Sequence, residues 1–115
     1  QAYAPTQTAI RTDRAIEADL CARATGRLQK AMQDVPTDYA ALVAATHENR
    51  RLWTTMAMSV ADNDNRLPSM LRAQLFYLAE FTEHQTKQVL NGSGDVQVLI
   101  DVNLAVLRGL NNQSA

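Results

Sequence analysis

The sequence predicts an all-α fold, a compact bundle of about four helices preceded by a short irregular N-terminal arm. Apolar residues recur at spacings of three and four in four segments, as on the buried face of an amphipathic helix. The 115 residues include only 4 Gly and 3 Pro, so there are few breaks. With 46% hydrophobic and 20% charged residues, the composition is that of one globular domain.

The N-terminal arm is expected to be flexible over residues 1–11, which lack a helical period and contain Pro5. A first helix is expected from Thr12 or Asp13, because either residue can cap a helix N-terminus. Pro36 ends this helix, since the residue before a proline disfavours the helical conformation. The apolar stripe of this helix consists of Ile16, Leu20, Ala24, Leu28, Met32 and Val35.

The second helix is expected to begin after a cap at Thr37 or Asp38. It ends at the run Asp62–Asn65, which consists of four consecutive turn-forming residues. Its inner face is predicted to carry Tyr39, Leu42, Val43, Thr46, Asn49, Trp53, Met56 and Val60.

The third helix is expected to start at Pro68, which suits the first helical position because its missing N–H has no intrahelical partner there. Asn91-Gly92 is typical of a helix C-terminus. The stripe between them comprises Leu71, Leu75, Leu78, Thr82, Gln85 and Val89, flanked by Phe76, Phe81 and Leu90.

The last segment, Asp95–Leu110, has both a strand-like and a helix-like pattern. A single strand would find no partner for its backbone hydrogen bonds, so we expect a helix capped by Asp95. The whole organisation is then one helical domain over residues 12–110, with a flexible tail at 111–115.

The charge balance and the cysteine content exclude several classes of function. The net charge is −1, from 11 basic and 12 acidic residues, so no broad cationic surface is available for nucleic acid. No apolar run approaches the length of about 20 residues that spans a bilayer, so no membrane insertion is expected. The single cysteine, Cys21, forms no intramolecular disulfide, which fits a cytoplasmic protein.

Neither an enzyme nor a metal site is expected. His47-Glu48 resembles the start of a zinc-protease motif, but Arg51 stands where the second histidine is required. The chain has no Gly-rich phosphate loop, and Cys21 fits a packing role beside the first helical stripe. We therefore predict no catalytic residues, no metal ligands and no cofactor.

Two asparagines interrupt otherwise apolar stripes, Asn49 on the second helix and Asn103 on the last. A buried amide without a partner costs about 1–3 kcal/mol. Either the two amides form interhelical hydrogen bonds that fix the register of the helices, or they contact a binding partner. The methionines Met32, Met56, Met58 and Met70 are expected to fill the core, with an adaptable binding groove as the alternative.

Several short motifs give the chain a family resemblance. Asn49-Arg50-Arg51-Leu52-Trp53 (NRRLW), followed by Asn65-x-Leu67-Pro68-x-x-Leu71-Arg72-Ala73, resembles the flagellar biosynthesis protein FlaF family. Leu99-Ile100-x-x-Asn103 with Gly109-Leu110, the opening Ala2-Tyr3 and Arg14-x-x-Glu17 are similar to the same family.

The resemblance implies a cytosolic helical protein of bacterial flagellum assembly that binds flagellin as a chaperone and supports its synthesis and export. It also implies that the protein acts together with a second regulator, FlbT, which acts on flagellin messenger RNA. A bundle can hold an amphipathic flagellin helix in an apolar groove. The residues expected to bind the partner are Asn49, Arg50, Trp53, Leu71, Arg72, Leu75, Leu99, Asn103, Val106 and Leu107.

Three alternatives remain at this point. The same residues can form the core, so that the motifs preserve the fold. The protein can regulate flagellin expression through another protein, such as FlbT or the export machinery, and part of its apolar surface can then be an oligomer interface. It can also contact RNA directly through basic side chains, namely Arg50, Arg51, Arg66 and Arg72.

Overall fold

Four helices account for nearly all of the residues that the computed structural model describes, 5–33 and 38–114. They are α1 (Pro5–Gln33), α2 (Tyr39–Ala61), α3 (Ser69–Leu90) and α4 (Val96–Ser114). These described residues include no strand. The predicted all-α fold is therefore confirmed, and the ambiguous last segment is a helix.

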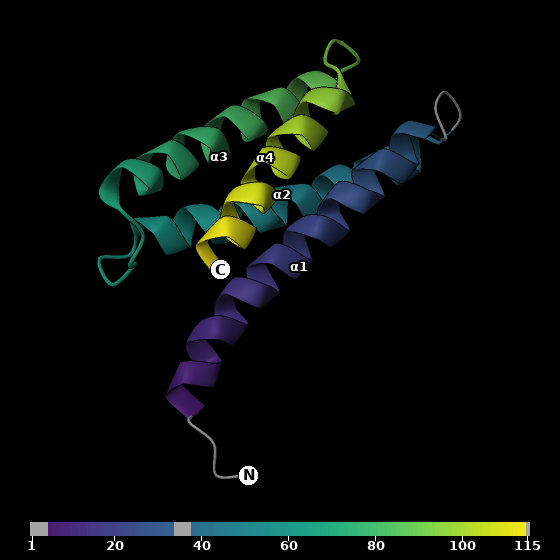
Figure 1. Ribbon diagram of the computed structural model, residues 1–115. Helices are drawn as coiled ribbons and strands as arrows, with labels where there is room; N and C mark the ends of the chain where they lie inside the picture. Colours follow the sequence, from purple (N-terminus) through teal and green to yellow (C-terminus); the bar gives the residue numbers. More distant parts are fainter. Residues whose placement is uncertain (1–4, 34–37, 115) are drawn as a thin grey trace.

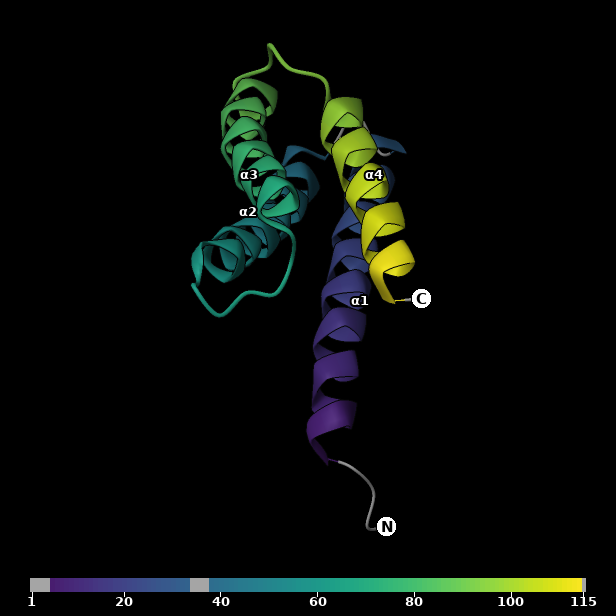
Figure 2. The same cartoon turned by 60° about the vertical axis from the view of Figure 1, so that its left-hand side comes forward.

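The helices are arranged as two pairs, α1 with α4 and α2 with α3 (Figure 1). The α2–α3 pair is an antiparallel hairpin, in which the Tyr39 hydroxyl at the start of α2 donates to the Leu90 carbonyl oxygen at the end of α3, at 2.9 Å. Helix α1 also packs on α2, and α3 contacts α4. Figures 1 and 2 show that the first turns of α1 extend beyond the other three helices.

The helix boundaries follow from local hydrogen bonds. Asp38 Oδ1 accepts from the backbone N–H of Ala41 at 2.9 Å, which confirms the N-cap of α2. Asp95 Oδ1 accepts from the N–H of Gln97 at 2.9 Å at the start of α4. Pro68 is the N-cap of α3, so this helix begins at Ser69, one residue later than predicted. The breaks at 62–65 and 91–92 lie between helices as predicted.

Two predicted helix ends were wrong. Helix α1 begins at Pro5, well before Thr12, because proline suits the first turn of a helix and residues 6–11 contain no breaker. Helix α4 continues to Ser114 beyond Leu110, since the residues that follow contain neither Gly nor Pro. The predicted arm and tail are thus helical over 5–11 and 111–114, whereas residues 1–4 and 115 lie outside the described part.

The predicted stripe of α1 was only partly correct. Leu20 and Met32 are 43% and 37% exposed, whereas the helix buries Cys21, Ala24, Thr25, Leu28 and Ala31. The reason is geometric: four residues turn a helix by about 40° more than one full rotation, so a strict four-residue repeat drifts off the buried face. The residues that α1 does bury recur at spacings of three and four, so they stay on the side that faces the other helices. Val35 and the Ile16 side chain lie outside what the structure describes.

The core consists of two apolar clusters. The first, the Trp53 cluster, comprises Cys21, Ala24, Leu52, Trp53, Met56, Val60, Leu75 and Val106. The second, the Leu99 cluster, comprises Leu28, Ala31, Ala45, Val89, Val96, Leu99 and Ile100. Each cluster draws on all four helices, so both hold the two helix pairs together.

A layer of buried polar side chains separates these clusters. Along α2, Asn49 lies between Ala45 of the Leu99 cluster and Leu52 of the Trp53 cluster. Along α4, Asn103 likewise follows Ile100 and precedes Val106. This polar layer comprises Thr25, Thr46, Asn49, Thr82, Thr86 and Asn103, each at most 3% exposed.

Gly92 and Gly26 offer a matched pair of substitutions. Gly92 has φ +89°, where an L-residue costs roughly 1–2 kcal/mol, and its N–H donates to the Val89 carbonyl oxygen at the end of α3. Gly92→Ala should therefore destabilise the protein by about that amount. Gly26→Ala, inside α1 with open space around it, should stabilise by about 0.5–1 kcal/mol. Urea unfolding checks both, and a Gly92→Ala variant as stable as wild type would contradict the assigned turn.

Candidate functional site

The two asparagines of the polar layer form a hydrogen-bonded chain with the only tryptophan. Trp53 Nε1 donates to Asn103 Oδ1 at 2.9 Å, and Asn103 Nδ2 donates to Asn49 Oδ1 at 2.7 Å. These bonds connect α2 to α4 across the bundle, although the backbones of these two helices do not pack together. The layer's threonines bond only within their own helices: each hydroxyl donates to a carbonyl oxygen three or four residues earlier.

The indole fixes the orientation of both amides. An indole N–H is a donor only, so Asn103 must turn its oxygen toward Trp53 and its nitrogen toward Asn49. Asn49 then uses its oxygen as the acceptor, which leaves its nitrogen as the free end of the chain. Asn49 Nδ2 is buried and has no hydrogen-bond partner among the described residues. A buried donor in this state is unfavourable by about 1–3 kcal/mol.

Most of the predicted partner-binding residues lie inside the bundle. Leu71, Arg72 and Leu107 are half-buried, as is Arg50. The others are buried: Asn49, Trp53, Leu75, Leu99, Asn103 and Val106. The structure brings the two asparagines and Trp53 together, and the buried aliphatic residues belong to the two core clusters. A partner-binding role for the set as a whole stays a prediction.

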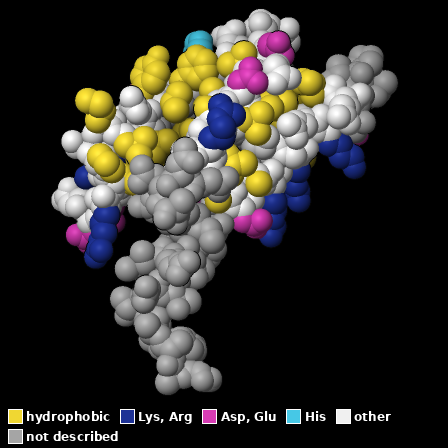
Figure 3. All heavy atoms as spheres, viewed as in Figure 1, with side chains coloured by type: hydrophobic (Ala, Val, Ile, Leu, Met, Phe, Trp, Pro, Cys, Tyr) yellow, Lys and Arg dark blue, Asp and Glu magenta, His cyan; other side chains and the backbone are white. Residues whose placement is uncertain are grey.

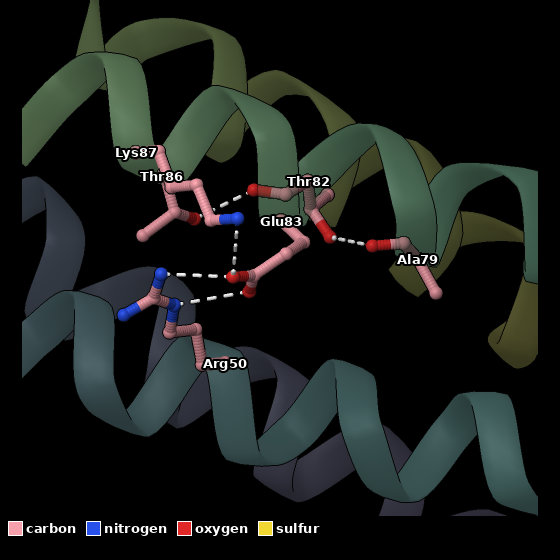
Figure 4. A network of polar contacts seen from close by, with 6 residues as sticks. All are labelled: Arg50, Ala79, Thr82, Glu83, Thr86 and Lys87. Atoms are coloured by element: carbon pink, nitrogen blue, oxygen red, sulfur yellow. Dashed lines mark hydrogen bonds and ion pairs between the residues drawn. The ribbon is translucent and has the colours of Figure 1, made fainter.

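Two of the four arginines in the RNA-binding alternative, Arg50 and Arg72, have separate roles in the α2–α3 hairpin. Arg50 forms a bidentate ion pair with Glu83 of α3, with Nε to Oε1 at 3.0 Å and Nη2 to Oε2 at 2.8 Å (Figure 4). Arg72 donates to the carbonyl oxygens of Val60 and Asp62 at the end of α2, at 2.9 and 2.8 Å. Arg50 and Val60 are about 15 Å apart along α2, so these two guanidinium groups do not converge.

A groove of about 430 Å³ runs between α2 and α3. Its floor is formed by buried side chains of both helices, Asn49 and Trp53 from α2 and Thr82 and Thr86 from α3. The remainder of its lining is more exposed and comprises Arg50, Thr54, Ala57, Met58, Phe76, Ala79, Glu80 and Glu83. The free amide of Asn49 thus belongs to a residue that lines an open groove.

A second groove, of about 520 Å³, lies between α1 and α2. Its apolar lining is Leu20, Ala24, Ala44, Leu52 and Met56, and its charged and polar lining is Glu17, His47, Glu48, Arg51 and Thr55. Glu48 forms an ion pair with Arg27 of α1 at this groove. The NRRLW motif is therefore divided between two grooves: Asn49, Arg50 and Trp53 face the first, and Arg51 and Leu52 face the second.

Four large apolar side chains are exposed on the α2–α3 pair, and two of them are methionines for which a binding groove was the alternative to the core. Met58 is 70%, Met70 74%, Tyr77 65% and Phe76 44% exposed. The expectation that methionines fill the core holds only for Met56, since Met32 is exposed as well. Figure 3 shows hydrophobic side chains gathered over α3 and α4, while several of the Lys and Arg side chains follow the edge formed by α1. The sequence did carry a signal for this exposed surface: α3 has more large apolar residues than its buried stripe can hold, and Phe76 is one of them.

The Cys21 thiol is buried in the Trp53 cluster. Burial raises the pKa of the Cys21 thiol, which donates to the backbone carbonyl oxygen of Asn103 at 3.5 Å. His47 and His84 are exposed. Within residues 5–33 and 38–114, His, Cys, Asp and Glu side chains form no cluster able to hold a metal ion. In the same residues, no helix has the length and apolar character needed to cross a membrane.

The comparison with protein families agrees with the motifs. The family model described as "Flagellar protein FlaF" matches residues 1–110, from before α1 into the last turns of α4. The chain belongs to the FlaF family. Neither curated proteins nor solved structures gave a match. FlaF membership implies a flagellar role, and the NRRLW motif of this FlaF chain supplies both the free amide and the indole that orients it.

Proposed function

We propose that this FlaF-family protein is a cytoplasmic, non-enzymatic flagellin-binding protein that supports the synthesis and export of flagellin. It holds an amphipathic helix of flagellin in the apolar groove between α2 and α3. The observation that supports this proposal is the exposure of Met58 and Phe76 at a groove whose floor contains an unpartnered amide. Exposed methionine and aromatic side chains adapt to varied apolar partners.

The groove meets the chemical needs of such a client. An export client that is unfolded before assembly presents an amphipathic segment, and covering its apolar face prevents aggregation. Because ordering the segment costs free energy, the complex stays reversible and the client can be passed to the export machinery. The Arg50–Glu83 ion pair bridges the two helices that line the groove, so it holds their spacing while Phe76 and Met58 stay accessible.

Titration calorimetry with monomeric flagellin tests the proposal through two matched substitutions. Phe76 lines the α2–α3 groove and Leu20 lines the α1–α2 groove, and their exposed fractions are 44% and 43%. Phe76→Ser should weaken binding tenfold or more, because the client loses an apolar contact, whereas Leu20→Ser should change the affinity less than about threefold.

Two outcomes would contradict this expectation. If wild-type protein gives no binding heat with flagellin at tens of micromolar, direct flagellin binding is wrong, and regulation through another protein becomes the better account. If Leu20→Ser abolishes binding while Phe76→Ser does not, flagellin occupies the α1–α2 groove. Circular dichroism of each variant verifies that the helices are intact before titration.

A further inference from the structure

The floor of the α2–α3 groove carries a hydrogen-bonding pattern that the apolar lining does not explain. Asn49 is 1% exposed and lines the groove, yet its Nδ2 has no partner among the described residues. Its Oδ1 is already occupied by Asn103 Nδ2, on the side of α4. The nitrogen is therefore the end of the amide that is left for the groove.

Two acceptors lie on the same floor. The Thr82 hydroxyl donates its proton to the Ala79 carbonyl oxygen at 2.9 Å, and the Thr86 hydroxyl donates to the Thr82 carbonyl oxygen at 2.6 Å (Figure 4). Each hydroxyl oxygen retains capacity to accept a further hydrogen bond. The floor thus presents one unpartnered NH₂ group, with two N–H donors, from α2 and two hydroxyl acceptors from α3.

The charges around the groove disfavour an ionised ligand group. Arg50 contacts Glu83 through two hydrogen bonds and Lys87 lies 4.0 Å from the same carboxylate, while Glu80 adds a second negative charge, so the four charges balance. A client carboxylate would lose its hydration without gaining an unpaired cation, because Arg50 and Lys87 both already contact Glu83. A client ammonium or guanidinium group carries donors only and cannot accept from Asn49 Nδ2.

We propose that the α2–α3 groove is selective for a client helix that inserts an uncharged carboxamide side chain, Asn or Gln, between its apolar anchors. The carboxamide oxygen accepts from Asn49 Nδ2, and its nitrogen donates to Thr82 or Thr86 Oγ1. A helical client satisfies its own backbone carbonyl groups, so the acceptor must come from a side chain. This inference rests on the proposed flagellin binding and names the residue type that the groove recognises.

The test compares a substitution of the groove donor with a substitution of a buried polar residue that does not line the groove. Asn49→Leu removes the groove donor together with its bond to Asn103. Thr46→Val removes a hydroxyl of the same polar layer and leaves the Asn49 amide and its bond to Asn103 in place. Binding of monomeric flagellin is measured by calorimetry well below the melting temperature of each variant. We expect Asn49→Leu to weaken binding about tenfold or more and Thr46→Val to change it less than about threefold.

Thr82→Val/Thr86→Val tests the second half of the recognition pattern. Valine keeps the shape of threonine and removes the two acceptors, so the affinity should fall about threefold or more, and unchanged affinity would overturn the carboxamide assignment. Thr46→Val is the control, because Thr46 belongs to the same polar layer but does not line the groove.

The outcomes separate this inference from the proposed function. Absence of flagellin binding to the wild type overturns both. Wild-type binding with an unaffected Asn49→Leu, or an equal loss in Asn49→Leu and the control, overturns only the carboxamide recognition. In the supporting case, the side-chain NH₂ resonances of Asn49, identified by their absence in Asn49→Leu, also move downfield when flagellin is added.

Discussion

Replacing Trp53 with alanine is expected to lower the free energy of unfolding by about 3–5 kcal/mol, the usual cost of removing a large buried aromatic side chain. Trp53 is 3% exposed in the centre of its apolar cluster, and its N–H occupies Asn103 Oδ1. The loss therefore combines a cavity with an unpaired acceptor. Urea unfolding followed by circular dichroism is the suitable measurement, because the substitution removes the only tryptophan fluorophore.

Trp53→Phe is the control that separates the two contributions. It retains an aromatic ring but removes the indole N–H, so it should cost less than Trp53→Ala and still about 1–3 kcal/mol for the unpaired Asn103 oxygen. A Trp53→Ala variant within about 1 kcal/mol of wild type would contradict the assigned burial.

Asn103→Leu is expected to lower the free energy of unfolding by about 2–6 kcal/mol. The substitution leaves both the Trp53 N–H and the Asn49 oxygen buried without a partner, and each unpaired group costs about 1–3 kcal/mol. Its measurement is a double-mutant cycle with Asn49→Leu, using urea unfolding of all four proteins. The double variant leaves only the indole N–H unpaired, so it should be more stable than the sum of the single effects predicts. Strictly additive effects would mean that the two amides do not interact.

The sequence predicted the helices well because each helix has a local signal. Asp38 and Asp95 cap α2 and α4 through their own carboxylates, and the 62–65 and 91–92 breaks contain residues that favour turns. The start of α1 and the end of α4 were missed because the residues there carry no strong start or stop signal. Pro5 was interpreted as a residue of an irregular arm, although it begins a helix.

The site was predicted less completely, because side-chain pairing across helices leaves no local pattern. Asn49 and Asn103 stood out as polar residues on apolar stripes, but no spacing in the sequence indicates that one amide bonds the other and leaves a single nitrogen free. The sequence likewise did not determine whether Met58 and Met70 are exposed, because a flexible methionine side chain suits a core as well as a binding surface.

The most direct test of groove binding is an NMR titration of flagellin into protein labelled at the methionine methyl groups. The four methionines report on different sites: Met58 lines the α2–α3 groove, Met56 the α1–α2 groove, Met70 an exposed patch of α3, and Met32 none of these. We predict that the Met58 signal shifts or broadens on addition of flagellin while the Met32 signal stays in place. A shift of Met56 with an unchanged Met58, or no shift of any methionine at saturating flagellin, would contradict binding in the α2–α3 groove.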